Sequence, residues 1–135
     1  MKKKFVYNET VRIYDTDAQG IVHYAGYYRF FTDALEQFIW DKLDGKYPLV
    51  NERTWFVVVE SSAKYHASAR LGDKLSISLV PSQLSDKAVR FDFVIHRKTE
   101  LICDGYITQV AIDREKWKAT AIPKSVIESL FQKKS

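Results

Sequence analysis

Apolar residues recur at helical spacing between Tyr24 and Leu43. Within this stretch, apolar side chains follow one another at three- and four-residue intervals, and acidic and amide side chains occupy the opposite side. The pattern predicts a long amphipathic helix whose wide apolar stripe packs against a broad surface such as a sheet. Asp44 and Gly45 then supply a stop signal. The stripe consists of Tyr27, Phe30, Phe31, Ala34, Leu35, Phe38, Ile39 and Leu43.

The remaining apolar runs have the period of β-strands. Alternation of apolar and polar positions predicts strands, and short turns between the last four runs favour an antiparallel meander. Pro123 opens a short final helix that extends to about Phe131. We therefore expect an α+β fold, in which a curved five-stranded antiparallel sheet wraps the long central helix. The strand-like runs cover residues 5–14, 55–66, 74–80, 88–96 and 101–112.

Size and composition fit one soluble domain over residues 1–135. The net charge of +4 comes largely from lysines near the two ends, and no nucleic-acid-binding motif accompanies it. Cys103 is the only cysteine, so no internal disulfide can form and a reducing, cytoplasmic location is expected. No stretch approaches the roughly 20 apolar residues that a membrane span needs. The three histidines lack metal-ligand spacing, so no metal or cofactor is expected.

The segment YDTDAQGIVHYAGYY, residues 14–28, gathers the side chains best suited to chemistry. Two carboxylates, a histidine and several tyrosines meet where a strand hands over to a helix. Helix starts offer unpaired N–H groups that stabilise oxyanions, and a nearby carboxylate can attack a carbonyl or activate water. An Asp beside a turn, however, often only caps it, and His23 and the tyrosines could be structural. The residues alone indicate a candidate acid–base loop.

The run VRIYDTDAQGIVHYAGYYRFF resembles the signature of the 4-hydroxybenzoyl-CoA thioesterase family. It is also similar to acyl-CoA thioesterases encoded with the Tol-Pal envelope system. The resemblance covers nearly the whole chain. The matching elements are Asp15-Thr16-Asp17, Gly20, Val22, Tyr24, Tyr27, the ARLGDKL stretch at residues 69–75, Gly105 and Ile122-Pro123.

This resemblance implies a hot-dog fold, and a homodimer or homotetramer with active sites between subunits. It also implies an acyl-CoA thioesterase acting on acyl or aroyl thioesters, with Asp17 as nucleophile or general base. Tyr24 and His23 are further candidates for the catalytic residues. Tyr24 matches the aroyl branch at a position where the Tol-Pal relatives carry His, and His23 precedes it. Family enzymes polarise the thioester carbonyl with a backbone N–H at a helix start, which we expect within residues 53–56.

Substrate-binding residues are less clearly marked. The arginines that bind coenzyme A phosphates in the aroyl branch have no match at Ser85-Asp86, and Lys87 is the nearest basic residue. Trp55 is a candidate for the border of an acyl pocket. Lys64 and Arg70 are weaker candidates for the phosphates.

Three other functions compete with hydrolysis. A non-catalytic hot-dog protein would bind an acyl thioester or a protein partner. A hot-dog dehydratase or hydratase would use a catalytic His in different local surroundings from those of His23. A nucleic-acid binder would need a basic stripe on a structured face, whereas the lysines here lie largely near the ends.

Overall fold

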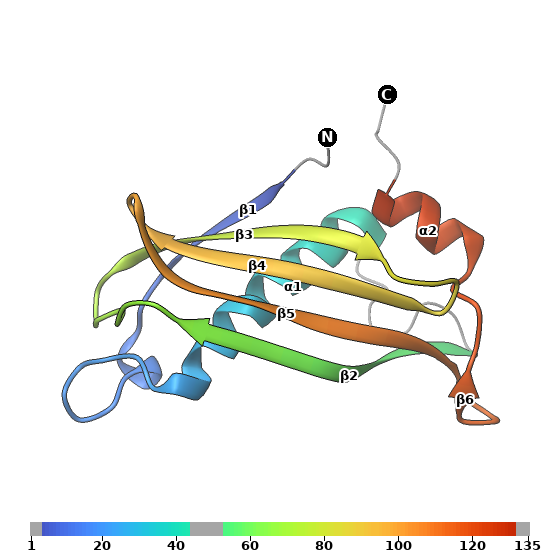
Figure 1. The fold of residues 1–135 in the computed structure, drawn as a ribbon, viewed down its shortest axis with the longest axis horizontal. Helices are drawn as coiled ribbons and strands as arrows, with labels where there is room; N and C mark the ends of the chain where they lie inside the picture. Colours follow the sequence, from blue (N-terminus) through green and yellow to red (C-terminus); the bar gives the residue numbers. More distant parts are fainter. Residues whose placement is uncertain (1–3, 44–52, 132–135) are drawn as a thin grey trace.

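A single antiparallel sheet curves around one long helix (Figure 1). The computed structural model describes residues 4–43 and 53–131. The strand order is β1-β3-β4-β5-β2, and β6 pairs with the far end of β5. The predicted hot-dog arrangement of a long helix in a curved sheet is therefore confirmed. The elements are β1 (Phe5–Thr10), α1 (Tyr27–Leu43), β2 (Thr54–Tyr65), β3 (Lys74–Gln83), β4 (Ala88–Arg97), β5 (Glu100–Asp113), β6 (Lys118–Ala119) and α2 (Lys124–Phe131), with 3-10 turns at Ile13–Asp15 and Tyr24–Gly26.

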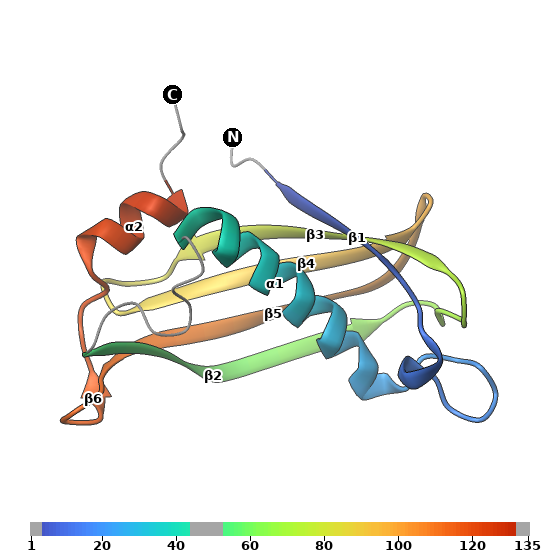
Figure 2. The same cartoon turned by 180° about the vertical axis from the view of Figure 1, so that it is seen from behind.

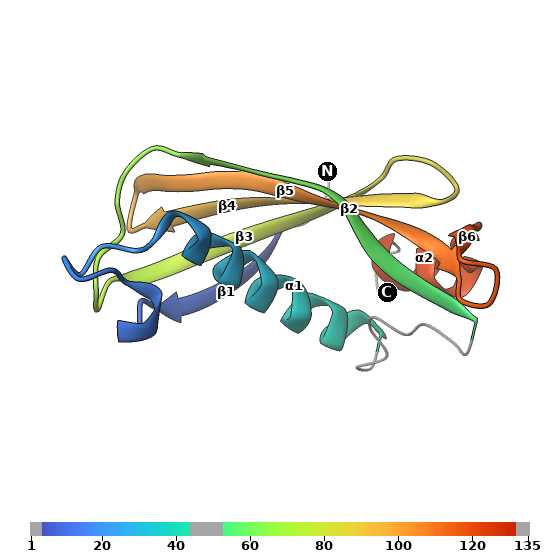
Figure 3. The same cartoon turned by 90° about the horizontal axis from the view of Figure 1, so that it is seen from below.

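Helix α1 lies across the concave face of the sheet (Figures 2 and 3). Its predicted stripe is buried, apart from the partly buried Leu43. The Phe31 ring stacks on that of Phe93 in β4, with centroids 4.7 Å apart. Beneath the helix, a Cβ atom on Gly105 would lie 2.2 Å from the Ser62 carbonyl oxygen and 2.9 Å from the Phe31 ring. The absent side chain at position 105 thus sets how closely the helix approaches the sheet.

The prediction of a meander is wrong for β2. Strands β3, β4 and β5 follow one another, but β2 pairs with β5 and forms one edge of the sheet. The segment between β2 and β3 makes no tight hairpin because it bonds to the loop before α1. Val22 N–H donates to the Ala69 carbonyl at 2.9 Å, and Leu71 N–H donates to the Gly20 carbonyl at 2.9 Å. Such long-range pairing leaves no mark in local periodicity.

Several predicted boundaries also move. The first strand ends at Thr10 instead of Tyr14, because the Asp15 carboxylate accepts the Arg12 N–H at 2.8 Å and closes a 3-10 turn. Ile13, which lies in this turn, is 75% exposed as a result. The long helix begins as a 3-10 turn at Tyr24 and becomes α-helical at Tyr27.

Two further predictions concern the later part of the chain. The two-residue strand β6 makes the sheet six-stranded instead of five-stranded. The final helix after Pro123 is confirmed. The expected stop signal at Asp44 and Gly45 lies outside the described residues. No helix in the described part of the chain is long and apolar enough to cross a membrane.

We expect Gly105→Ala to lower the free energy of unfolding by at least about 2 kcal/mol, because the new methyl group would overlap backbone that cannot move freely. Urea unfolding monitored by circular dichroism measures the change. Ser62→Ala, which alters the neighbouring strand by a small side-chain deletion, should change the same free energy by less than about 0.5 kcal/mol. Equal stability of the Gly105→Ala variant and the parent would contradict the close approach of β2 and α1 to Gly105.

Candidate active site

The three residues of the Asp15-Thr16-Asp17 motif have three different environments. Asp15 is buried, with 4% of its surface exposed. Thr16 donates its hydroxyl hydrogen to the Ile13 carbonyl at 2.9 Å, which closes the 3-10 turn. Asp17 is exposed on the loop that follows. Of the two carboxylates, only Asp17 is therefore accessible to a ligand.

The carboxylate of Asp17 is held through one oxygen. Its Oδ1 accepts the Gln19 N–H at 2.8 Å and the Ile21 N–H at 3.2 Å. The Asp17 N–H donates to the Ile21 carbonyl at 2.9 Å, and Gly20 completes this turn with a φ of 76°, a conformation that favours glycine. Oδ2 has no hydrogen-bond partner among the described residues. The carboxylate is thus oriented, with one oxygen left for another molecule.

The start of the helical segment lies a few residues further along the chain. The Nδ1 of His23 accepts the Ala25 N–H at 3.3 Å, and the His23 carbonyl accepts the Gly26 N–H at 2.7 Å. The Tyr24 N–H, at the first position of the turn, has no acceptor in the described part of the chain. His23 therefore acts as a cap, and Tyr24 offers a backbone donor.

A cleft of about 310 Å³ opens beside this turn. The Tyr65 hydroxyl donates to the Tyr24 carbonyl at 3.0 Å, and the Tyr27 hydroxyl accepts the Ala69 N–H at 3.1 Å, so the two rings that wall the cleft are fixed. Asp17 is not part of the wall, but its loop leads directly into it at Val22. The lining residues are Val22, Tyr24, Tyr27, Tyr65, His66, Ala67 and Ser68.

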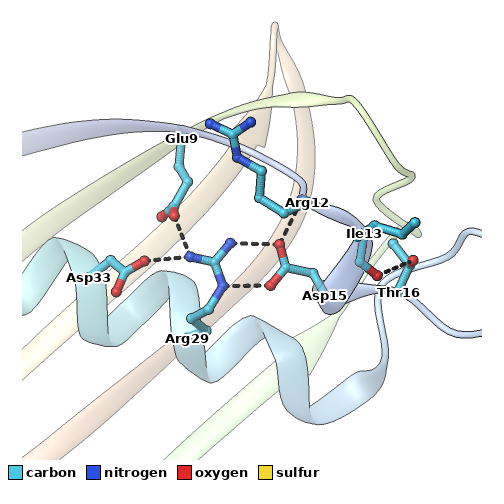
Figure 4. Close-up of polar contacts among 7 residues, drawn as sticks. All are labelled: Glu9, Arg12, Ile13, Asp15, Thr16, Arg29 and Asp33. Atoms are coloured by element: carbon cyan, nitrogen blue, oxygen red, sulfur yellow. Dashed lines mark hydrogen bonds and ion pairs between the residues drawn. The ribbon is translucent and has the colours of Figure 1, made fainter.

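A cluster of charged side chains contacts Asp15 of the motif (Figure 4). Arg29 of α1 forms ion pairs with Asp15, with Glu9 of β1 and with Asp33 one helical turn away. Sequence reasoning missed this cluster. Its only local sign is an arginine between Tyr28 and Phe30, with an Asp four positions later.

Comparison with known proteins identifies the family. The family model described as "Thioesterase-like superfamily" matches residues 11–130. The chain belongs to this superfamily. It is 31% identical to the acyl-CoA thioester hydrolase YbgC of Escherichia coli O6:H1, over 90% of this chain and 93% of that protein. It is 26% identical to a 1,4-dihydroxy-2-naphthoyl-CoA hydrolase of Nostoc punctiforme, over 93% of this chain and 86% of that protein.

Solved structures of thioesterases share the fold. A gentisyl-coenzyme A thioesterase superimposes with a TM-score of 0.80 at 25% identity, covering 93% of this chain and 99% of that one. A 1,4-dihydroxy-2-naphthoyl-CoA thioesterase from Synechocystis reaches a TM-score of 0.85 at 21% identity, covering 95% and 96% of the two chains. These likenesses confirm the predicted resemblance to hot-dog thioesterases.

Of the predicted substrate-binding residues, Trp55 and Lys87 lie away from the Asp17 loop, whereas Arg70 pairs with Ile21 of that loop. Residues 54–56 begin β2 and pair with β5, so the expected helix start at residues 53–56 is not found. Trp55 packs against Trp117, with ring centroids 6.1 Å apart. Lys87 belongs to the turn between β3 and β4, at the end of the sheet opposite the Asp17 loop (Figure 1). One copy of the chain does not bring these residues together.

The remaining candidates have structural surroundings. Cys103 is fully buried, and burial raises the pKa of its thiol to about 12. It is a core residue. No cluster of three or more His, Cys, Asp or Glu side chains that could hold a metal occurs within residues 4–43 and 53–131.

The charge cluster should make stability depend on pH. The pKa of the Glu9 carboxyl is raised from 4.5 to about 7, chiefly by burial and next by the hydrogen bond to Asp33, while Arg29 lowers it. Because the folded protein holds this proton more tightly than the unfolded chain, Glu9 favours folding below pH 4.5, and this contribution is lost as the pH rises to about 7.

In Glu9→Gln, we expect the loss of stability between about pH 4.5 and pH 7 to disappear, because the glutamine side chain does not titrate. Relative to the parent, the variant should gain about 1–3 kcal/mol in the free energy of unfolding between about pH 4.5 and pH 8. Urea unfolding across this range measures the difference. Glu128→Gln, at an exposed position of α2, is the control and should follow the parent. Parallel pH profiles for Glu9→Gln and the parent would contradict the assignment.

Proposed function

We propose that the protein hydrolyses an acyl- or aroyl-CoA thioester to the free acid and coenzyme A, with Asp17 as nucleophile or general base. The observation that carries the proposal is the exposed Asp17 carboxylate, held through Oδ1 and free at Oδ2, on the loop that leads to the free Tyr24 N–H. Relatives that span most of the chain are named for the hydrolysis of CoA thioesters, which supports the same reaction.

The chemistry requires few groups. Oδ2 of Asp17 either attacks the thioester carbonyl or removes a proton from a water that attacks it. The carbonyl oxygen becomes an oxyanion, and we propose that the Tyr24 N–H at the start of the 3-10 turn stabilises it. The C–S bond then breaks, and coenzyme A leaves as a thiolate that takes up a proton. On the nucleophilic route, a water then hydrolyses the anhydride between Asp17 and the acyl group, which releases the free acid and restores the carboxylate. In this scheme His23 serves as the cap of the turn.

A non-catalytic role remains the second candidate. The two hydrogen bonds to Oδ1 are those of an Asp that merely stabilises its own turn. Such a protein would bind an acyl thioester in the cleft beside Tyr24 without cleaving it. The two functions differ in thiol release, which the next experiment measures.

We expect Asp17→Asn to reduce turnover at least about a hundredfold, equivalent to about 2.7 kcal/mol of transition-state stabilisation. The amide oxygen of Asn can still accept the Gln19 and Ile21 N–H groups, so the loop should keep its shape. Free thiol released from short, long and aromatic acyl-CoA esters is the readout. Asp41→Asn, an exposed carboxylate at the far end of α1, is the control. Turnover that is absent in the parent, or unchanged in Asp17→Asn, would favour the binding protein.

The substrate proposal includes a homodimer or homotetramer formed through the edge strand β2. Val58 and Val59 on this edge are 56% and 58% exposed, and β2 is hydrogen-bonded on one side only. Two copies of β2 paired antiparallel would place opposite ends of the two sheets together. Lys87 of the partner subunit would then approach the Asp17 loop, where it and Trp55 of the partner subunit would contact coenzyme A.

We expect Val58→Lys to shift the protein from dimer or tetramer toward monomer and to lower turnover, because a charge at the interface loses its hydration. Light scattering after size-exclusion chromatography gives the mass. The matched control is Val6→Lys, a 50% exposed valine on the opposite edge strand β1, which should keep the parental mass. Dissociation by Val6→Lys alone would place the interface elsewhere.

We extend the proposal to domain organisation and location. One hot-dog domain accounts for residues 1–135, and the buried Cys103 thiol suits a reducing cytoplasm.

A further inference from the structure

We infer that Arg29 is a positioning residue, which acts through Asp15 to fix Asp17 relative to the Tyr24 N–H. The inference rests on the proposed function, because it assigns those two groups to the reaction. The Arg29 guanidinium lies in the charge cluster (Figure 4), and among the described residues it forms no hydrogen bond or ion pair with Asp17. Its effect on chemistry must therefore pass through Asp15.

The contact between Arg29 and Asp15 is bidentate. Arg29 Nε donates to Asp15 Oδ1 at 2.5 Å, and Arg29 Nη2 donates to Asp15 Oδ2 at 2.6 Å. Two parallel bonds between planar groups fix orientation as well as distance. The side chain of Asp15 is only 2% exposed, so water cannot replace these bonds easily. Asp15 is thereby held in one position against α1.

Asp15 connects the two groups that the reaction needs. Its Oδ2 also accepts the Arg12 N–H at 2.8 Å, which fixes the chain before the motif. Its carbonyl oxygen accepts the His23 N–H at 3.0 Å, immediately before Tyr24. Along the chain, Asp15 stands two residues before Asp17. A shift of Asp15 would therefore change the position of Asp17 relative to the Tyr24 N–H, which lies at the start of the second 3-10 turn.

Arg29 is anchored on its other side. Its Nη1 forms ion pairs with Glu9 of β1 and with Asp33 of α1, the latter at 2.6 Å. The guanidinium carbon lies 4.7 Å from the centre of the Phe30 ring and 5.2 Å from that of Tyr14. Through Asp15, the Asp17 loop is thus attached to the Arg29 guanidinium, which contacts with β1 and α1 hold in place.

If the ion pair were purely structural, breaking it would also destabilise the protein, because a charge would remain buried without its partner. The positioning role differs from this in what it does to kcat. Displacing Asp17 by about 1 Å can cost about a hundredfold in rate while substrate binding is retained. A split between kcat and KM therefore separates the two roles.

The experiment compares Asp15→Asn and Arg29→Lys with Leu130→Ala. Lys keeps the charge of Arg29 but cannot form the bidentate pair. Leu130 is buried in α2, far from the motif, and its truncation should cost about 2–5 kcal/mol of stability without touching the loop. Turnover of the best acyl-CoA ester is measured well below the melting temperatures of all variants. Exchange of the Gln19 and Ile21 amide hydrogens is followed by NMR.

We expect kcat to fall about 10- to 100-fold in Asp15→Asn and in Arg29→Lys, with KM within about twofold of the parent. The Gln19 and Ile21 amides, which Asp17 holds, should exchange at least about tenfold faster in both variants. Leu130→Ala should keep the parental kcat and the parental exchange at these two amides.

Parental kcat and parental exchange in Asp15→Asn and Arg29→Lys would overturn the inference, as would losses no larger than those of Leu130→Ala. If the parent itself releases no thiol, the proposed function fails, and the amide exchange alone decides whether Arg29 positions the Asp17 loop.

Discussion

Burial of the wide apolar stripe of α1 in the concave face of the sheet is the interaction on which the other features depend. The sheet curves around the helix, and the side-chain-free position at Gly105 lets Phe31 reach β4, where it stacks on Phe93. Because the helix is fixed along its length, its first residues are fixed too. The loop before it, which two 3-10 turns and backbone bonds to residues 69 and 71 also hold, can therefore keep Asp17 and the Tyr24 N–H in a defined geometry.

The charged cluster around Arg29 extends this constraint into the loop. In this cluster the Arg29 cation is paired with three carboxylates. The pKa of the Glu9 carboxyl is raised to about 7, chiefly by burial, so Glu9 is protonated more readily than an exposed glutamate. The two oxygens of Asp15 are used by Arg29 and Arg12, whereas Asp17 keeps an oxygen without a partner. The motif thus separates a buried carboxylate that is fully paired from an exposed one that keeps an oxygen for another molecule, as the proposed function requires.

The uncovered edge strand β2 is the second feature that bears on the site. Strand β2 leaves one side of its backbone and two exposed valines uncovered, while the candidate substrate residues Trp55 and Lys87 lie at the end away from Asp17. The proposed site assembled from two copies would reconcile these facts. It would also explain why a cleft of about 310 Å³ in one copy includes tyrosines of the helix start but not Asp17 itself.

The periodicity of apolar residues determined the long helix, the final helix and five of the strands, because these depend on which face of each segment is apolar. It did not reveal the short strand β6. Resemblance along the chain determined the superfamily, and it singled out Asp17 because the motif is local in sequence. The tertiary structure decided the position of β2 beside β5, the 3-10 turns that expose Ile13 and start the helix segment, and the pairing of Asp15 with Arg29. Each of these depends on hydrogen bonds or ion pairs between residues far apart in the chain, and such pairs leave no periodic signal in the sequence.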